Sequence, residues 1–169
     1  MGDIEAWLAS HQTEEAPEVL ACSESAALDP VLHIAVTAPA ALPLLLARTQ
    51  SVDERNAIGK TALMVAAQFD QLESVRLLLA AQARVNASTW QHDDVSQLTL
   101  SHDARTPLMY AAANASLPLI KLLLASGADP WQADTKGRRA IDYLLGFGPT
   151  QANPKLSPEE RAEAQRLLF

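Results

Sequence analysis

The sequence predicts an all-α protein made of short helix pairs that pack against one another as repeated units. Apolar residues recur at helical spacing in two neighbouring segments, 61–67 and 72–81. Helices this short are not stable alone in water, so each must bury its apolar face against a neighbour of matching shape. The same pair of segments returns later in the chain, and this second pair can serve as the neighbour.

A constant period relates the copies. The copy that begins at Thr61 aligns with one that begins at Thr106, and a further copy begins one period later at Arg139. An earlier, degraded copy precedes them. Leucine runs fall at matching places, at 44–46, 77–79 and 122–124. Because Thr61 and Thr106 lie 45 residues apart, 12 extra residues separate the second and third copies.

The period of about 33 residues, the hexapeptide TPLMYA at 106–111 and the later leucine run together resemble the ankyrin repeat. The resemblance implies a solenoid of paired antiparallel helices with β-hairpin-like fingers, one of them extended by the insertion. It also implies that the Thr caps the first helix, paired alanines let helices approach, and a glycine ends the second helix. Gly127 fits this last role, whereas Gln82 and Thr49 replace it in earlier copies and predict strained turns.

The chain is expected to form one domain over residues 1–169, since its length suits a single domain. Its expected units are an N-terminal cap (1–27), repeat 1 (28–55), repeat 2 (56–88), the finger insertion (89–100), repeat 3 (101–133) and a C-terminal capping repeat (134–169). The caps would shield the apolar ends of the stack.

Local signals predict where several elements begin. Pro39 is expected to start the second helix of repeat 1, with Pro43 in its first turn. Ser157 and Glu160 form a capping-box pattern, which predicts a final helix over 158–168 after an elongated loop. Trp131 stands where the preceding finger has Asn86, so the ring either packs on the next finger or is presented to a partner.

Composition excludes several classes of function. The net charge is −7 and the pI about 5.0, so no basic stripe is expected to bind nucleic acid, and a basic protein partner is favoured. No apolar run approaches the ~20 residues that a membrane-spanning helix needs. Cys22 is the only cysteine, which excludes an intramolecular disulfide. The start of the chain does not resemble a signal peptide. We expect a cytoplasmic monomer, or a periplasmic one if a signal peptide has been removed.

No catalytic motif stands out in the sequence. It has no glycine-rich phosphate loop, no G-x-S-x-G, no H-E-x-x-H and no paired-cysteine metal motif. We therefore expect neither an enzyme nor a bound cofactor. The family resemblance implies a binding surface instead, made of the finger tips and the exposed edges of the first helices.

Carried over position by position, the resemblance implies a set of partner-binding residues on this concave side. Phe69 is the sharpest candidate, because a large aromatic just past a helix suits a binding hot spot. The alternative for Phe69 is packing against the turn over 68–72. The carried-over residues are Arg55, Ile58, Lys60, Gln68, Phe69, His102, Asp103, Arg105, Asn114, Lys136 and Arg138. Trp90, Asp93 and Asp94 of the inserted loop and Trp131 of the last finger complete the expected binding set.

The insertion is the least regular part of the chain. Its residues include metal-ligand types, but no two histidines lie at a recognised ligand spacing, so a partner-facing loop is favoured over a metal site. Asp93, Asp94 and Asp103 are expected to act as exposed charges that set the association rate.

We therefore expect a non-enzymatic protein-protein interaction module. Two alternatives remain at this point. One is an inhibitor or immunity protein, of bacterial origin, that neutralises a basic toxin or effector. The other is a metal or small-molecule sensor that uses the inserted loop.

Overall fold

The computed structural model describes residues 38–56, 58–89, 103–147 and 151–169. Seven helices occur in this part of the chain: α4 (Leu42–Leu46), α5 (Ala62–Gln68), α6 (Leu72–Ala80), α7 (Pro107–Asn114), α8 (Leu117–Ala125), α9 (Ala140–Leu145) and α10 (Pro158–Leu168). The described residues contain no extended strand, and an antiparallel bridge joins Arg55 and Thr61. The all-α prediction is confirmed.

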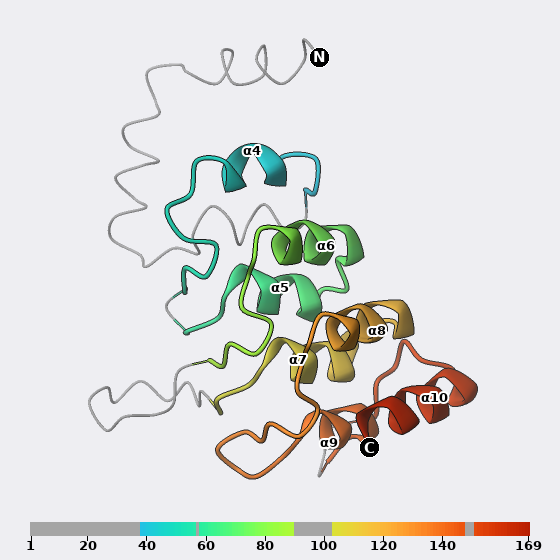
Figure 1. Cartoon of the computed structure of the whole chain (residues 1–169). Helices are drawn as coiled ribbons and strands as arrows, with labels where there is room; N and C mark the ends of the chain where they lie inside the picture. The colour runs from blue at the N-terminus through green and yellow to red at the C-terminus, as the bar shows by residue number, and fades with distance from the viewer. Residues whose placement is uncertain (1–37, 57, 90–102, 148–150) are drawn as a thin grey trace.

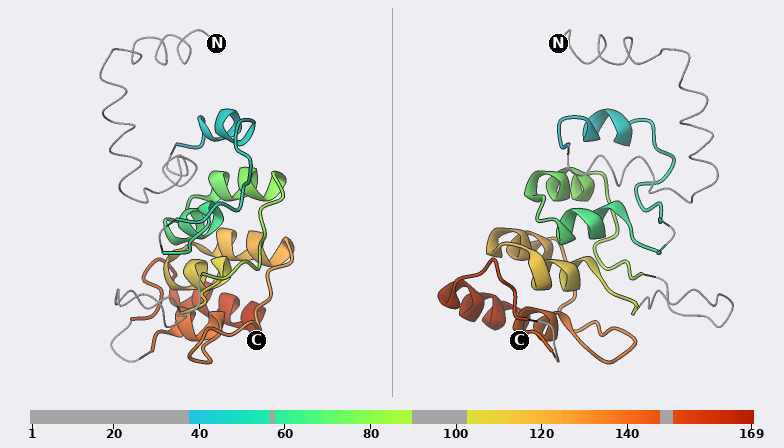
Figure 2. Two further views of the ribbon diagram at one scale, coloured as in Figure 1. Left: turned by 90° about the vertical axis from the view of Figure 1, so that its left-hand side faces the viewer. Right: turned by 180° about the vertical axis from the view of Figure 1, so that it is seen from behind.

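The helices stack in chain order as pairs (Figure 1). Helices α5, α7 and α9 form an inner row in which each contacts the next, while α6 contacts α8 and α8 contacts α10 in an outer row. The loops that follow α4, α6 and α8 project to the same side of the stack (Figures 1 and 2). The expected N-terminal cap, residues 1–27, lies outside the described residues.

The predicted caps begin the inner helices. Thr61 Oγ1 accepts a hydrogen bond from Met64 N at 3.4 Å, and Thr106 Oγ1 accepts one from Met109 N at 3.3 Å. Arg139 replaces the threonine in the last repeat, where the Asp142 carboxylate reaches back to the Arg139 N–H at 2.7 Å. Helix α10 begins after Ser157, which forms the predicted capping box with Glu160.

One predicted boundary is wrong. Helix α4 begins at Leu42, after the cap residue Ala41, so Pro43 lies in its first turn and Pro39 precedes it. A proline is tolerated throughout a first turn, and the sequence pattern alone did not distinguish the two positions.

Small side chains allow the inner helices to approach closely. Ala66, Ala67, Ala111 and Ala112 are fully buried. Larger buried residues, among them Leu63, Leu78, Leu108, Leu123 and Leu144, fill the space between the two rows. Interiors of this kind are close-packed, so the inner contact leaves little room for a longer side chain.

In two turns, Gln82 and Ala104 stand where a glycine is favoured. Gly127 ends α8 with φ +90°, and Gln82 holds the matching position after α6 with φ +64°. Ala104 has φ +56° at the finger position that Gly59 and Gly137 occupy in the neighbouring repeats. This left-handed conformation costs a residue with a Cβ atom about 1–2 kcal/mol. The predicted strain is therefore present at Gln82, whereas the backbone of Thr49 does not adopt a positive φ.

Hydrogen bonds repeated at the same position tie each finger to the next. The Asp53 carboxylate accepts from Arg84 N at 2.9 Å. Asn86, at the matching position of the next finger, accepts from Asp129 N at 2.8 Å and donates to Gly127 O at 2.9 Å. These bonds explain why an asparagine or aspartate suits this position. Trp131 stands at the matching position of the last finger, and its indole has no acceptor atom for the same bond.

The chain between α9 and α10 reaches back across the array through a buried asparagine. Asn153 is fully buried, and its side-chain amide donates to the Ala112 and Ala115 carbonyls at 2.9 and 2.8 Å. These carbonyls lie at the end of α7, where backbone acceptors lack partners within the helix. The bonds fix the capping unit to the third repeat.

Asp70 joins three repeats. Its carboxylate accepts from the backbone and hydroxyl of Ser116 at 2.9 and 2.8 Å, and from Lys155 Nζ at 3.0 Å. Partial burial opposes ionisation of Asp70, but the hydrogen bonds from Ser116 and Lys155 outweigh it and lower the pKa of this carboxyl.

No helix in the described part of the chain has both the length and the apolar character needed to cross a membrane.

We predict that Ala111→Leu destabilises the protein by ~1–3 kcal/mol, because the added carbons overpack the contact between inner helices. Denaturant unfolding followed by circular dichroism measures the change. Ala125→Leu, at the exposed end of α8, is the matched control and should have little effect. Equal stability of Ala111→Leu and the parent would contradict the stacking of inner helices at this residue.

We also predict that Asp70→Asn lowers the melting temperature near pH 7 and that this deficit disappears in acid. A carboxyl whose pKa is lowered by folding stabilises the folded state above its unfolded pKa, which is ordinarily 3.8. That contribution is lost as pH falls through the lower folded value. Asparagine tolerates the positive φ of this position, so the backbone is preserved. Thermal melts of both proteins from pH 7 to pH 2 provide the comparison; a deficit of constant size would disprove the electrostatic explanation.

Candidate partner-binding surface

Two finger tips are shaped by the same side-chain bonds. Asn56 Oδ1 accepts from Ile58 N at 3.2 Å and Lys60 N at 2.9 Å. Asp134 Oδ1 accepts from Lys136 N and Arg138 N, both at 2.8 Å. Short polar side chains that bond to the backbone a few residues onward stabilise tight turns. The tips therefore hold their candidate binding residues in a defined geometry.

Lys60, Arg105 and Arg138 occupy one position in three successive repeats, directly before the inner-helix cap. We call them the cationic row. Lys60 Nζ lies 4.6 Å from the ring centroid of Tyr110, and Arg105 Cζ lies 5.1 Å from that of Tyr143, each in the following repeat. Cations placed over aromatic faces in this way are attracted by the ring. The row is thus tied to the inner helices and keeps the spacing of the stack.

The last cation of the row contacts two rings. Arg138 Cζ lies 4.3 Å from the Phe147 centroid and 5.4 Å from that of Tyr143, and the two rings meet edge to face at 5.1 Å. Tyr110 and Tyr143 are separated by one repeat period, so they occupy equivalent positions. Neither tyrosine was among the expected site residues, although the sequence shows that both stand at the same position of the repeat.

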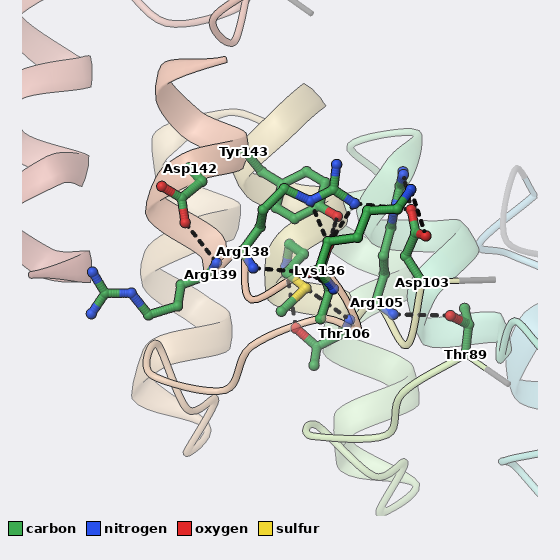
Figure 3. Close-up of polar contacts among 11 residues, drawn as sticks. Thr89, Asp103, Arg105, Thr106, Lys136, Arg138, Arg139, Asp142 and Tyr143 are labelled. Carbon is green, nitrogen blue, oxygen red and sulfur yellow. Dashed lines mark hydrogen bonds and ion pairs between the residues drawn. The ribbon is translucent and has the colours of Figure 1, made fainter. Parts of the chain in front are cut away.

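Asp103 lies at the centre of the cations (Figure 3). Its carboxylate pairs with Arg105 at 2.9 Å and with Lys136 and Arg138 at 3.0 Å, and its side chain is only 4% exposed. The expectation that Asp103 is an exposed charge facing a partner is wrong. A buried carboxylate needs paired cations, and here it holds three of them together.

Asp134 fixes the last finger to the inner helix α9. Its Oδ2 accepts from Arg138 Nε at 2.7 Å and from the Tyr143 hydroxyl at 2.6 Å. Burial opposes ionisation of Asp134, yet the bonds from Tyr143 and Arg138 lower its pKa. Burial and the bond to Asp134 raise the pKa of Tyr143. Near neutral pH the aspartate is charged and the tyrosine is not.

Phe69 directly follows the residue that bonds to the first cation of the row. Its neighbour Gln68 accepts a hydrogen bond from Lys60 Nζ at 2.6 Å, while Phe69 itself is 55% exposed. The equivalent residue in the last repeat is Phe147, which Arg138 covers. This exposure favours a ring presented at the surface over one packed against the following turn.

Three further expected residues lie around this surface. Arg55 is exposed and donates from Nη1 to Gly59 O at 2.8 Å and to Ser88 O in the next finger. Asn114 is half-buried at the end of α7. Trp131 is 57% exposed, with the Arg139 guanidinium 4.9 Å from its ring centroid, so the ring is not buried against another finger.

The insertion leaves the stack between two residues that pair. Thr89 N donates to Arg105 O, and Arg105 N donates to Thr89 Oγ1, both at 2.9 Å. The described chain on either side of residues 90–102 is therefore held together by these two bonds (Figure 3). Four expected site residues fall outside the described residues: Trp90, Asp93, Asp94 and His102.

Comparison with known proteins agrees with this architecture. A family model described as ankyrin repeats (3 copies) matches residues 7–89 and 32–134. The zinc finger CCCH domain-containing protein 56 of Arabidopsis thaliana is 36% identical over 51% of this chain, and the nuclear factor NF-kappa-B p105 subunit of Mus musculus is 36% identical over 59%. The ankyrin repeat and LEM domain-containing protein 1 homolog of Caenorhabditis elegans is 32% identical over 50%.

The aligned segments cover only 11%, 9% and 10% of these three relatives, respectively, so the similarity concerns the repeats and not the whole proteins. The family model, in contrast, matches well over half of this chain. The chain belongs to the ankyrin-repeat family.

Proposed function

We propose that this protein binds another protein through the concave face formed by its finger tips and inner helices. Ankyrin repeats generally mediate protein–protein interactions, and no catalytic domain is evident beside them. The observation that carries the proposal is Phe69, a large ring that is more than half exposed and directly follows Gln68, the residue bonded to the first cation of the row. Exposed aromatic residues of this kind are enriched among binding hot spots.

Contacts within the protein support a rigid binding face. The cations are held over tyrosine rings and around Asp103, and the finger tips are braced by their own side chains. A surface already ordered before association loses less conformational entropy on binding. Phe69 and Trp131 then supply apolar area at separate repeats of the same array.

The proposed binding face does not include the ends of the array. Leu167 on α10 is 41% exposed, so it offers apolar area away from the fingers. It belongs to the capping helix, and the proposal assigns it no part in binding. Leu167 therefore provides a matched apolar control for Phe69.

We predict that Phe69→Ala weakens binding of the partner at least thirtyfold, which corresponds to about 2 kcal/mol. The partner is first isolated with the tagged full-length protein, and purified components are then titrated by calorimetry. Trp131→Ala should also weaken binding, whereas Leu167→Ala should not.

Circular dichroism serves as the folding control, because truncating these exposed rings should leave the fold intact. Unchanged affinity in folded Phe69→Ala and Trp131→Ala would rule out the concave face and direct attention to the outer helices.

A further inference from the structure

We infer that the concave face takes an acidic segment of its partner, in which aspartate or glutamate side chains flank an apolar residue. The inference rests on the proposed function and specifies the chemistry of the partner. It replaces the expectation of a basic partner, which relied on the charge of the whole chain.

Charge is distributed unevenly over the protein. The chain carries −7 overall. The described finger residues, 48–56, 58–60, 84–89, 103–106 and 127–139, contain eight arginines and lysines but five aspartates and glutamates, so these fingers carry +3. The charge of the fingers, not the total, decides what these surfaces attract at close range.

The acidic groups near the cationic row point inward. Asp103 is 4% exposed and the Asp134 side chain is fully buried, and both are engaged by arginine at 2.7–3.0 Å. The cations remain more accessible: the side chains of Lys136 and Arg105 are 56% and 33% exposed. Around Arg105, Lys136 and Arg138, a partner therefore meets mainly donor groups.

The geometry of the arginines suits a carboxylate. A guanidinium offers five N–H donors in a planar fork that matches two carboxylate oxygens. Among the described residues, Arg105 uses Nη2 for Asp103, and one third of its side chain stays exposed to a partner. Its ring contact with Tyr143 keeps the fork oriented. Bonds between arginine and carboxylate are stronger than those between neutral groups.

Phe69 adds an apolar contact at one end of the row. Gln68 bonds to Lys60, and the next residue in the chain carries the exposed ring of Phe69. A segment that pairs carboxylates with the row while covering Phe69 would bury this ring. The combination requires acidic residues around an apolar one, and a purely basic segment would meet like charge.

The test is a selection of displayed random 12-residue peptides on the intact protein. We expect the enriched peptides to contain more aspartate and glutamate than the starting library. A synthetic, fluorescently labelled copy of the most enriched peptide then gives affinities by anisotropy, at low and high NaCl. Added salt should weaken its binding, as screening of charge requires.

Lys136→Ala should weaken this peptide about fivefold or more, since it removes an accessible cation from the face. Lys121→Ala is the matched control: this lysine is 48% exposed on the outer helix α8, where it pairs with Glu163. Phe69→Ala should weaken the same peptide. Arg105→Lys keeps the charge and removes the fork, and should also weaken it.

Enrichment of neutral or basic peptides would overturn the inference, as would equal affinities for Lys136→Ala and Lys121→Ala. The experiment distinguishes loss of the acidic specificity from loss of the concave binding face. If Phe69→Ala abolishes binding of a basic peptide, the concave face stands and its acidic specificity falls. If neither Phe69→Ala nor Lys136→Ala alters binding, both proposals fall.

Discussion

The close contact between inner helices is the constraint on which the rest of the structure depends. Helices of six to eight residues, such as α5, α7 and α9, have no stability of their own in water. They persist because the buried alanine pairs at 66–67 and 111–112 allow each helix to pack closely on the next. Every finger and every surface residue takes its place from that contact.

Polar groups then hold neighbouring units in one register. Asp53 and Asn86 brace successive fingers, Asp70 joins three repeats, and Asn153 satisfies the end of α7 from the capping unit. Each of these bonds crosses between repeats. The stability of a repeat array is the sum of the stabilities of its units and of the interfaces between them. These bonds strengthen the interfaces and so compensate for the low stability of each short helix.

The same register generates the candidate binding surface. Because Lys60, Arg105 and Arg138 share one repeat position, stacking the helices places them in a row and brings each of the first two to a tyrosine of the next repeat. Asp103 draws the later cations together. Phe69 is 55% exposed in the second repeat, while the equivalent Phe147 is partly buried beneath Arg138.

The sequence alone was enough to predict the helix pairs and their threonine and serine caps, because these depend on local chemistry and on a constant repeat period. Only the folded chain decided that Asp103 is buried among three cations and that Asp134 is buried against Arg138, which leaves Lys136 and Arg105 as the more accessible charges. Burial and pairing depend on residues from different repeats, at positions such as 103 and 138, and no local pattern specifies which of them meet in space.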